Sequence, residues 1–208
     1  MANDARQFWE SFYGEREQVW SGRPNPLLVR EVEPLTPGTA LDLGCAEGAD
    51  AIWLAERGWR VTAVDISQTA LGRAAAHAAR VGVAGIEWVR HDLTATFPDG
   101  EFDLVSAQFF HSPVAGDGER EKILHRAAEA VAPGGTLLVA GHAGAPSWHD
   151  DPDHDVDFPT TADVLDGLDL HPARWRVETQ EVVEREMSGP DGQHGHRQDN
   201  VVRVRRLD

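Results

Sequence analysis

Acidic residues and glycines alternate over a short stretch of the chain, LDLGCAEGAD, which follows a run of apolar residues. Asp42 is followed by Gly44, Ala46 and Gly48 at every second position. Glycines at this spacing let a ligand approach the backbone, and a helix that starts there offers free N–H groups to it. The pattern therefore predicts a nucleotide-binding turn between a strand and a helix.

Asp65 ends the next β-branched stretch, WRVTAVD, 21 residues after Gly44. A carboxylate at that place can accept hydrogen bonds from both hydroxyls of a ribose, so the ligand should contain a nucleoside. The turn has no Lys or Arg from residue 39 to residue 56, and its acidic residues would repel a pyrophosphate. A nucleoside with a positively charged end fits better. S-adenosylmethionine has this chemistry, because it carries a sulfonium and an ammonium and no phosphate.

Residues 41–67 resemble motifs I and II of the class I S-adenosylmethionine-dependent methyltransferases. Three later stretches resemble further motifs of the family: HDL at 91–93, FDLVSAQFFH at 102–111 and PGGTLLVAG at 133–141. These motifs stand in the family's order and at family-like spacing. The resemblance implies an α/β, Rossmann-like fold with a seven-stranded, mostly parallel sheet, an antiparallel C-terminal strand and helices on both faces. It also implies S-adenosyl-L-methionine as methyl donor and S-adenosyl-L-homocysteine as product.

The same resemblance assigns residues to the cofactor. Asp65 would bind the ribose and Asp92 the adenine amino group, and their structural alternatives are a polar strand end and a loop acid. Ile66 and Leu93 would pack on the faces of the adenine. The other positions assigned to the cofactor are Trp20, Arg23, Asp42, Gly44, Cys45, Ala46, Gly48 and Gln108.

Ala46 departs from the family pattern, which has a glycine at this position. If the backbone there needs a positive φ, the Cβ atom costs about 1 kcal/mol, whereas at a negative φ the methyl group simply packs near the ligand. Alanine is the smallest such change, so the site is expected to survive. A methyltransferase-like module without chemistry is the alternative. Cys45, beside acidic residues, has no reason for a lowered pKa and is expected to be a small filler, not a nucleophile.

The N-terminal segment contains VWSGRPNPLL, with Trp20, Arg23 and Asn25 just before the first predicted strand. It resembles methyltransferases of the tellurite-resistance and thiopurine type, in which an N-terminal segment folds over the cofactor. The resemblance implies a lid at residues 19–25, with Arg23 pairing with the cofactor carboxylate and Trp20 shielding the sulfonium. A helix followed by a proline-bound turn is the alternative.

The methyl acceptor is expected next to the stretch AQFFHSP, after the fourth predicted strand. His111 could take a proton from a hydroxyl or amine acceptor, or it could have a packing role only. Phe109 and Phe110 could contact the acceptor and exclude water. The acidic loop at 149–155, HDDPDHD, matches no standard zinc or calcium spacing, so no metal is expected.

The elements that position these residues alternate between strands and helices. Apolar strands are predicted at 39–44, 59–65, 86–92, 102–108 and 135–142, and helices at 49–58, 67–82, 118–132 and 160–170, the third of them stopped by Pro133-Gly134. Apolar strands separated by helices indicate a parallel sheet covered on both faces. Two long alternating stretches at 174–187 and 197–208 then predict antiparallel strands, joined through a turn at 190–192.

Length and composition limit the class of protein. A chain of 208 residues suits one methyltransferase domain, with a helical lid segment at 1–36, a cofactor-binding core at 39–141 and a C-terminal helix and strands at 160–208. The net charge of −16 disfavours nucleic acid and anionic membranes as partners. One cysteine allows no internal disulfide, and no stretch reaches the length of a membrane span, so a cytoplasmic location is expected.

The sequence thus predicts methyl transfer from S-adenosylmethionine to a small molecule by in-line displacement. A module that binds the cofactor without transferring a methyl group is one alternative, and a nicotinamide-dependent oxidoreductase is another. No motif identifies the acceptor, its reacting atom or the oligomeric state.

Overall fold

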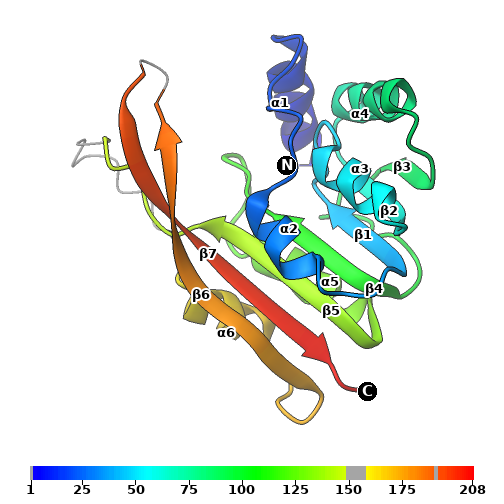
Figure 1. Ribbon diagram of the computed structural model, residues 1–208, viewed down its shortest axis with the longest axis vertical. Coiled ribbons are helices and arrows are strands. Elements are labelled where there is room, and N and C mark those ends of the chain that lie inside the picture. The colour runs from blue at the N-terminus through cyan, green and yellow to red at the C-terminus, as the bar shows by residue number, and fades with distance from the viewer. Residues whose placement is uncertain (1, 149–157, 190–191) are drawn as a thin grey trace.

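The computed structural model of the chain describes residues 2–148, 158–189 and 192–208 (Figure 1). Its strands form one seven-stranded sheet in the order β3-β2-β1-β4-β5-β7-β6. The parallel strands are β1 (Thr39–Leu43), β2 (Arg60–Asp65), β3 (Ile86–Arg90), β4 (Phe102–Gln108) and β5 (Val131–His142). The antiparallel β7 (His194–Arg206) lies between β5 and β6 (Trp175–Ser188). The predicted fold class is confirmed.

The six described helices are α1 (Ala2–Gly14), α2 (Pro26–Val32), α3 (Ala49–Glu56), α4 (Gln68–Val81), α5 (Glu119–Glu129) and α6 (Thr161–Leu168). In Figure 1, α2 lies in front of the sheet and α5 and α6 behind it. None of the described helices is both long and apolar enough to cross a membrane.

The central strands are almost continuously apolar because helices cover both of their faces. Successive side chains of a strand point to opposite faces. Leu137 accordingly belongs to the core that includes Leu124 of α5, whereas Leu138 belongs to the core that includes Leu28 of α2 and Leu54 of α3. These two apolar layers fix the sheet and therefore the positions of the loops at its edge.

Local signals place most of the helix ends. Ser67, expected as a cap, accepts a hydrogen bond from Ala70 N at 3.2 Å, and α4 ends at Val81 with Gly82 as its C-cap at φ 73°. The prediction that the helix from residue 118 includes Val131 and stops at Pro133-Gly134 is wrong, because α5 ends at Glu129. Val131 starts β5 and pairs with Phe102. A buried valine fits a helix face and a strand equally well, and here the pairing with β4 decides.

Helix α1 packs beside α4 (Figure 1). Glu10 of α1 accepts hydrogen bonds from the Ser67 hydroxyl at 3.2 Å and from Thr69 N at 3.3 Å. Burial acts to raise the pKa of Glu10, but these hydrogen bonds and those from the first turn of α4 outweigh it and lower the pKa. An anion at a helix N-terminus is favourable, so Glu10 fastens the N-terminal segment to α4.

Two predicted features fall partly or wholly outside the described residues. These are the acidic loop at 149–155 and the first two positions of the turn at 190–192.

Candidate active site

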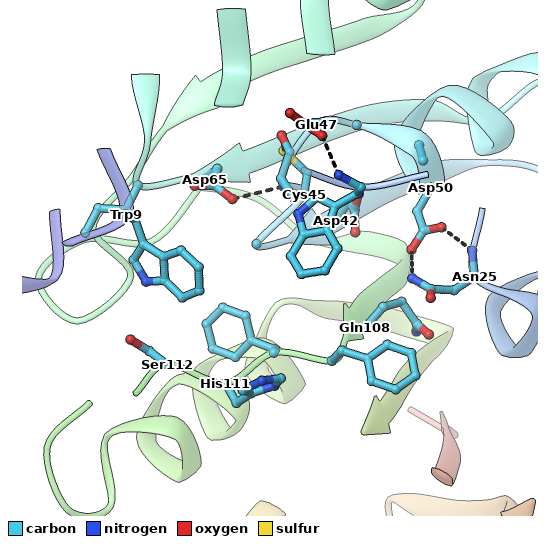
Figure 2. A pocket seen from close by; sticks show the side chains of 18 of the residues that line it. Trp9, Asn25, Asp42, Cys45, Glu47, Asp50, Asp65, Gln108, His111 and Ser112 are labelled. Atoms are coloured by element: carbon cyan, nitrogen blue, oxygen red, sulfur yellow. Dashed lines mark hydrogen bonds between the residues drawn. The ribbon is translucent and has the colours of Figure 1, made fainter. Parts of the chain in front are cut away.

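A cavity of about 640 Å³ lies at the carboxyl ends of β1, β2 and β4. In an open parallel sheet this is where ligands bind, at the point where the strand order reverses, here between β1 and β4. Figure 2 shows Asp42, Cys45 and Asp65 on one wall and His111 and Ser112 on the opposite wall. The cavity is lined by every residue to which the sequence pointed: Trp20, Arg23, Asp42, Gly44, Cys45, Ala46, Gly48, Asp65, Ile66, Asp92, Leu93, Gln108, Phe109, Phe110 and His111.

The turn after β1 uses left-handed backbone at every second residue. Gly44, Ala46 and Gly48 have φ values of 67°, 51° and 81°. A Cβ atom at Gly44 would lie 2.9 Å from the Phe110 ring, and one at Gly48 would lie 2.6 Å from the Trp88 ring. The two glycines are needed for space as well as for φ. Ala46 keeps the same conformation with a Cβ atom, so it carries the strain that a positive φ implies.

Asp65 connects the end of β2 with this turn. Its Oδ2 atom accepts Ala46 N at 2.9 Å, and its Oδ1 atom accepts Ser67 N at 2.9 Å. Burial raises the pKa of Asp65 to about 6, although these hydrogen bonds act in the other direction. With a further backbone hydrogen bond from Ile66, the carboxylate still has acceptor capacity for a ligand, because it offers about four acceptor positions.

Asp42 is a buried carboxylate whose Oδ2 atom has no hydrogen-bond partner among the described residues. Burial raises the pKa of Asp42 well above its usual range, and the charges of Asp50 and Asp65 raise it further. Buried polar atoms are normally paired, and an unpaired buried charge is costly. A cationic ligand group in the cavity would remove that cost.

Two acids, Glu47 of the turn and Asp50 at the start of α3, hold the N-terminal segment. Glu47 accepts Trp20 N at 2.9 Å, and Asp50 accepts both Asn25 N and Asn25 Nδ2 at 2.7 Å (Figure 2). Their charges therefore face the segment that covers the turn. The sequence indicated acidity near the ligand, and it did not indicate this anchoring role.

The segment before β1 contributes further aromatic residues to the cavity. Trp20 is half-exposed and donates its Nε1–H to the Tyr13 hydroxyl at 3.2 Å. Trp9 and Tyr13 of α1 also line the cavity, and neither was singled out from the sequence. The run FWESFY could have indicated them, since its aromatic residues recur at helical spacing.

The loop after β4 brings His111 against the end of β5. The ring centroids of His111 and His142 are 5.7 Å apart, and those of Phe109 and His142 are 4.6 Å apart. Burial lowers the pKa of His111, and the nearby charges of His142 and Arg120 lower it further. His111 is therefore neutral at pH 7.

His142, Arg185 and Asp199 line the same cavity, and no sequence pattern singled them out. His142 Nδ1 lies 2.9 Å from Asp199 Oδ1, and Arg185 Nε donates to Asp199 Oδ2 at 2.8 Å. These residues come from the ends or middles of three different strands, so only the register of the sheet brings them together.

Comparison with known proteins agrees with this geometry. Residues 40–135 match a family described as a methyltransferase domain. The 2-heptyl-1-hydroxyquinolin-4(1H)-one methyltransferase of Mycobacteroides abscessus is 33% identical over 193 residues, covering 84% of this chain and 83% of that protein. This chain belongs to the class I S-adenosylmethionine-dependent methyltransferases.

Solved structures share the fold of this methyltransferase. The N-methyltransferase NodS from Bradyrhizobium japonicum, in complex with S-adenosyl-L-homocysteine, superposes with a TM-score of 0.66 at 18% identity, covering 98% of this chain and all of that one. TehB from Haemophilus influenzae superposes with a TM-score of 0.68 at 15% identity, covering 95% of this chain and 66% of that one. Family membership makes S-adenosyl-L-methionine the methyl donor of this methyltransferase, with S-adenosyl-L-homocysteine as product.

Proposed function

We propose that this methyltransferase transfers the methyl group to a small, largely aromatic or apolar acceptor that binds in the same cavity as the cofactor. The observation that carries the proposal is a single cavity with two unlike walls. One wall is the acidic turn after β1, and the other holds Phe109, Phe110 and His111. A volume of about 640 Å³ suits small ligands, whose sites typically measure roughly 300–1,000 Å³.

The residues of the acidic wall fit S-adenosylmethionine. The unpaired Oδ2 atom of Asp42 suits the ammonium group, and the remaining lone pairs of Asp65 suit the ribose hydroxyls. Gly44 and Gly48 leave the backbone bare where a side chain would meet Phe110 or Trp88, so the turn can approach the ligand closely. The free Cys45 lies buried within this turn as a small residue.

The adenine position is supported by two residues after β3. The Oδ1 atom of Asp92 accepts hydrogen bonds from Thr94 N at 3.1 Å and from the Thr94 hydroxyl at 2.6 Å. This turn fixes the carboxylate at the cavity, where it can meet the adenine amino group. Leu93 and Ile66 line the cavity beside it and offer apolar contact for the two faces of the base.

Residues 1–36 act in this proposal as a lid on the core at 39–141, with 160–208 completing the domain. Arg23 lines the cavity and has no ion-pair partner in the described part of the chain. A free guanidinium at that place suits the carboxylate of the cofactor in bidentate geometry. Trp20, held by Glu47, would cover the sulfonium.

When bound, S-adenosylmethionine supplies an electrophilic methyl group on a sulfonium. The protein holds the acceptor in line with the breaking bond, and such positioning can contribute up to about 7–11 kcal/mol. Phe109, Phe110 and the N-terminal segment exclude water from the reaction. Gln108, whose Oε1 atom is buried without a partner in the described residues, can orient a polar group of either ligand.

A small acceptor is favoured over nucleic acid by two further observations. The net charge of −16 opposes phosphate contacts, and the M. abscessus relative is named for a small heterocyclic substrate. The acidic chain with one free cysteine is also suited to a cytoplasmic location.

The test is formation of S-adenosyl-L-homocysteine with three acceptor panels: small aromatic hydroxyl, amine and thiol compounds, ribosomal RNA, and protein. We expect turnover with the small compounds only. Turnover with RNA or protein alone would contradict the proposal, and cofactor binding without turnover on any panel would favour a binding module.

A further inference from the structure

The end of β5 and the middle of β7 form a histidine–carboxylate pair inside the cavity. His142 and Asp199 lie opposite each other in the sheet register, with Nδ1 and Oδ1 2.9 Å apart. Asp199 is 1% exposed and also accepts Arg185 Nε at 2.8 Å. The pair is thus built into the sheet, and its geometry does not depend on a surface loop.

The carboxylate fixes the tautomer of the histidine. Burial acts to raise the pKa of Asp199, but hydrogen bonds from His142 and Arg185 outweigh it and lower the pKa, so Asp199 is an anion. An anion accepts only, and Nδ1 of His142 must therefore carry the hydrogen. In the neutral ring this leaves Nε2 with a lone pair, and Nε2 has no hydrogen-bond partner among the described residues. A base oriented by a buried carboxylate in this way also gains stabilisation once it is protonated.

His111 is less well placed than His142 to act as the base. It has no carboxylate partner in the described residues, and burial disfavours its protonated form. Its neighbour His142 has an anion at 2.9 Å that would offset a positive charge. The role that the sequence suggested for His111 therefore fits His142 better.

The surroundings of this pair are cationic, in contrast to the chain as a whole. Arg120 and Arg197 line the cavity together with Arg185, and the acids that line it nearby are Asp199 and Glu119. Arg120 donates its Nε–H to Phe110 O at 2.9 Å, and Arg197 donates its Nε–H to Gly144 O at 2.8 Å. These bonds hold the side chains in place and leave their terminal nitrogens for a ligand. An oxygen that develops negative charge would be stabilised there.

We propose that His142, positioned by Asp199, is the general base for an acceptor whose reacting group is an acidic hydroxyl on an aromatic ring, which the surrounding arginines favour as its anion. The proposal rests on the small-molecule function proposed above. The hydroxyl proton passes to His142 Nε2. A lone pair of the acceptor oxygen forms the bond to the methyl carbon, while the carbon–sulfur bond breaks and its electron pair stays on sulfur. The proton then leaves His142 for water.

The kinetic test compares 4-methylphenol with 4-methylthiophenol, because the aromatic thiol ionises readily near neutral pH and needs no base, whereas this phenol stays neutral and does need one. His142→Gln should lower kcat/KM for the phenol by about 100-fold or more and for the thiol by less than about tenfold. Asp199→Asn should lower the phenol rate selectively, with the effect in kcat more than in KM. The matched control is His194→Gln, at an exposed histidine outside the cavity, which should behave like the parent protein.

Several outcomes of this kinetic comparison would contradict the role proposed for His142. Equal losses on both acceptors, or full phenol activity in His142→Gln, would overturn the assignment of the base. Thiol turnover without any phenol turnover in the parent would overturn the inference and leave the small-molecule function standing. Turnover of neither compound, with turnover of an amine from the small-molecule panel, would overturn the inference alone, and turnover of no small compound at all would overturn both. Calorimetric titration with S-adenosyl-L-homocysteine, unchanged within about threefold in each variant, shows that the cofactor side is intact.

A binding measurement tests the anion preference without turnover. 4-Nitrophenol absorbs at longer wavelength when ionised, so its state can be read in the complex with S-adenosyl-L-homocysteine-bound protein. At a pH where the free probe is mostly neutral, we expect the probe bound to the parent protein to be ionised. The ionised fraction of bound probe should be smaller in Arg197→Gln than in the surface control Arg80→Gln. A bound probe that stays neutral in the parent would overturn the anion preference.

Discussion

The carboxylate of Asp65, at the end of β2, accepts the backbone N–H of Ala46 at 2.9 Å, in the turn that follows β1. Ala46 has φ 51° and is flanked at two residues on each side by glycines with positive φ. The acid therefore holds a non-glycine residue in a conformation that a Cβ atom disfavours. The strained residue and the carboxylate that we propose as the ribose-binding group are thus joined by one hydrogen bond.

Replacing Ala46 by glycine should relieve this strain. We expect Ala46→Gly to raise the free energy of unfolding by about 0.5–1 kcal/mol and to keep or improve affinity for S-adenosyl-L-homocysteine. Ala76→Gly, on the exposed face of α4, is the matched control and should destabilise by a similar amount. Urea unfolding and calorimetric titration measure both quantities. A clear loss of affinity in Ala46→Gly would show that the methyl group packs usefully against the ligand.

Asp42→Asn should separate stability from binding. Because burial disfavours the ionised form of Asp42, Asp42→Asn should stabilise the ligand-free protein increasingly as the pH rises, whereas cofactor affinity should fall by about 1.5–3 kcal/mol because a charged hydrogen bond is lost. The control Asp99→Asn, at an exposed aspartate, should change neither. Thermal unfolding with and without S-adenosyl-L-homocysteine gives both values. Unchanged affinity would remove Asp42 from the ammonium site.

Gly44→Ala should cost more than the strain of a positive φ. The new Cβ atom would lie 2.9 Å from the Phe110 ring, so this ring must move at the acceptor wall. Gly82→Ala is a suitable control, because Gly82 has φ 73° and no atom within 4 Å of a built Cβ. We expect similar unfolding penalties of about 1 kcal/mol from φ, with a further loss of methyl transfer only at Gly44. Equal activity of the two variants would argue against Phe110 at the acceptor site.

The pH dependence of the free energy of unfolding should reveal the titration of Asp65. Its folded pKa of about 6 exceeds the unfolded value of about 3.9, so the folded state holds the proton more tightly. The contribution of Asp65 to the free energy of unfolding is therefore largest below about pH 4, and it is lost as the pH rises to about 6. The free energy of unfolding of the parent relative to Asp65→Asn should thus fall by up to about 3 kcal/mol across this range. Urea unfolding at several pH values measures it, and a relative stability that rises with pH would be the contrary result.

The N-terminal segment should respond to the cofactor. We expect S-adenosyl-L-homocysteine to slow amide exchange at residues 19–25, and Glu47→Gln to weaken this protection because Trp20 N loses a charged acceptor at 2.9 Å. Arg23→Ala should lower affinity by about 1.5–3 kcal/mol, and Arg80→Ala, at an exposed arginine of α4, should not. Exchange that is the same with and without ligand would exclude a lid.

The cofactor wall could be predicted because its signals are local in the chain. The turn from Asp42 to Gly48 lies within seven residues, and the apolar strands around it predict a parallel sheet directly. The predicted class I fold and methyl donor are confirmed, and the assigned residues all line one cavity. Their individual contacts with the ligands stay predictions.

Phe109, Phe110 and His111 of the acceptor wall were singled out from the sequence, but its histidine–carboxylate pair could not be predicted because the two residues are far apart in the chain. His142 and Asp199 meet only through the register of β5 against β7, and an alternating polar strand does not reveal which of its acids is buried. Trp9 and Tyr13 reach the cavity because Glu10 fastens α1 to α4, a contact between distant segments. The secondary structure of Val131 could not be predicted for the same reason, because its pairing with β4, and not the local sequence pattern, makes it part of a strand.

A crystal structure of the protein with S-adenosyl-L-homocysteine would show directly whether the cofactor lies in the cavity as proposed. We expect the ribose hydroxyls on Asp65, the amino group on the Oδ2 atom of Asp42, and the sulfur facing the wall of Phe110, His111 and His142. A ligand bound outside this cavity, or one whose sulfur faces away from that wall, would contradict this placement.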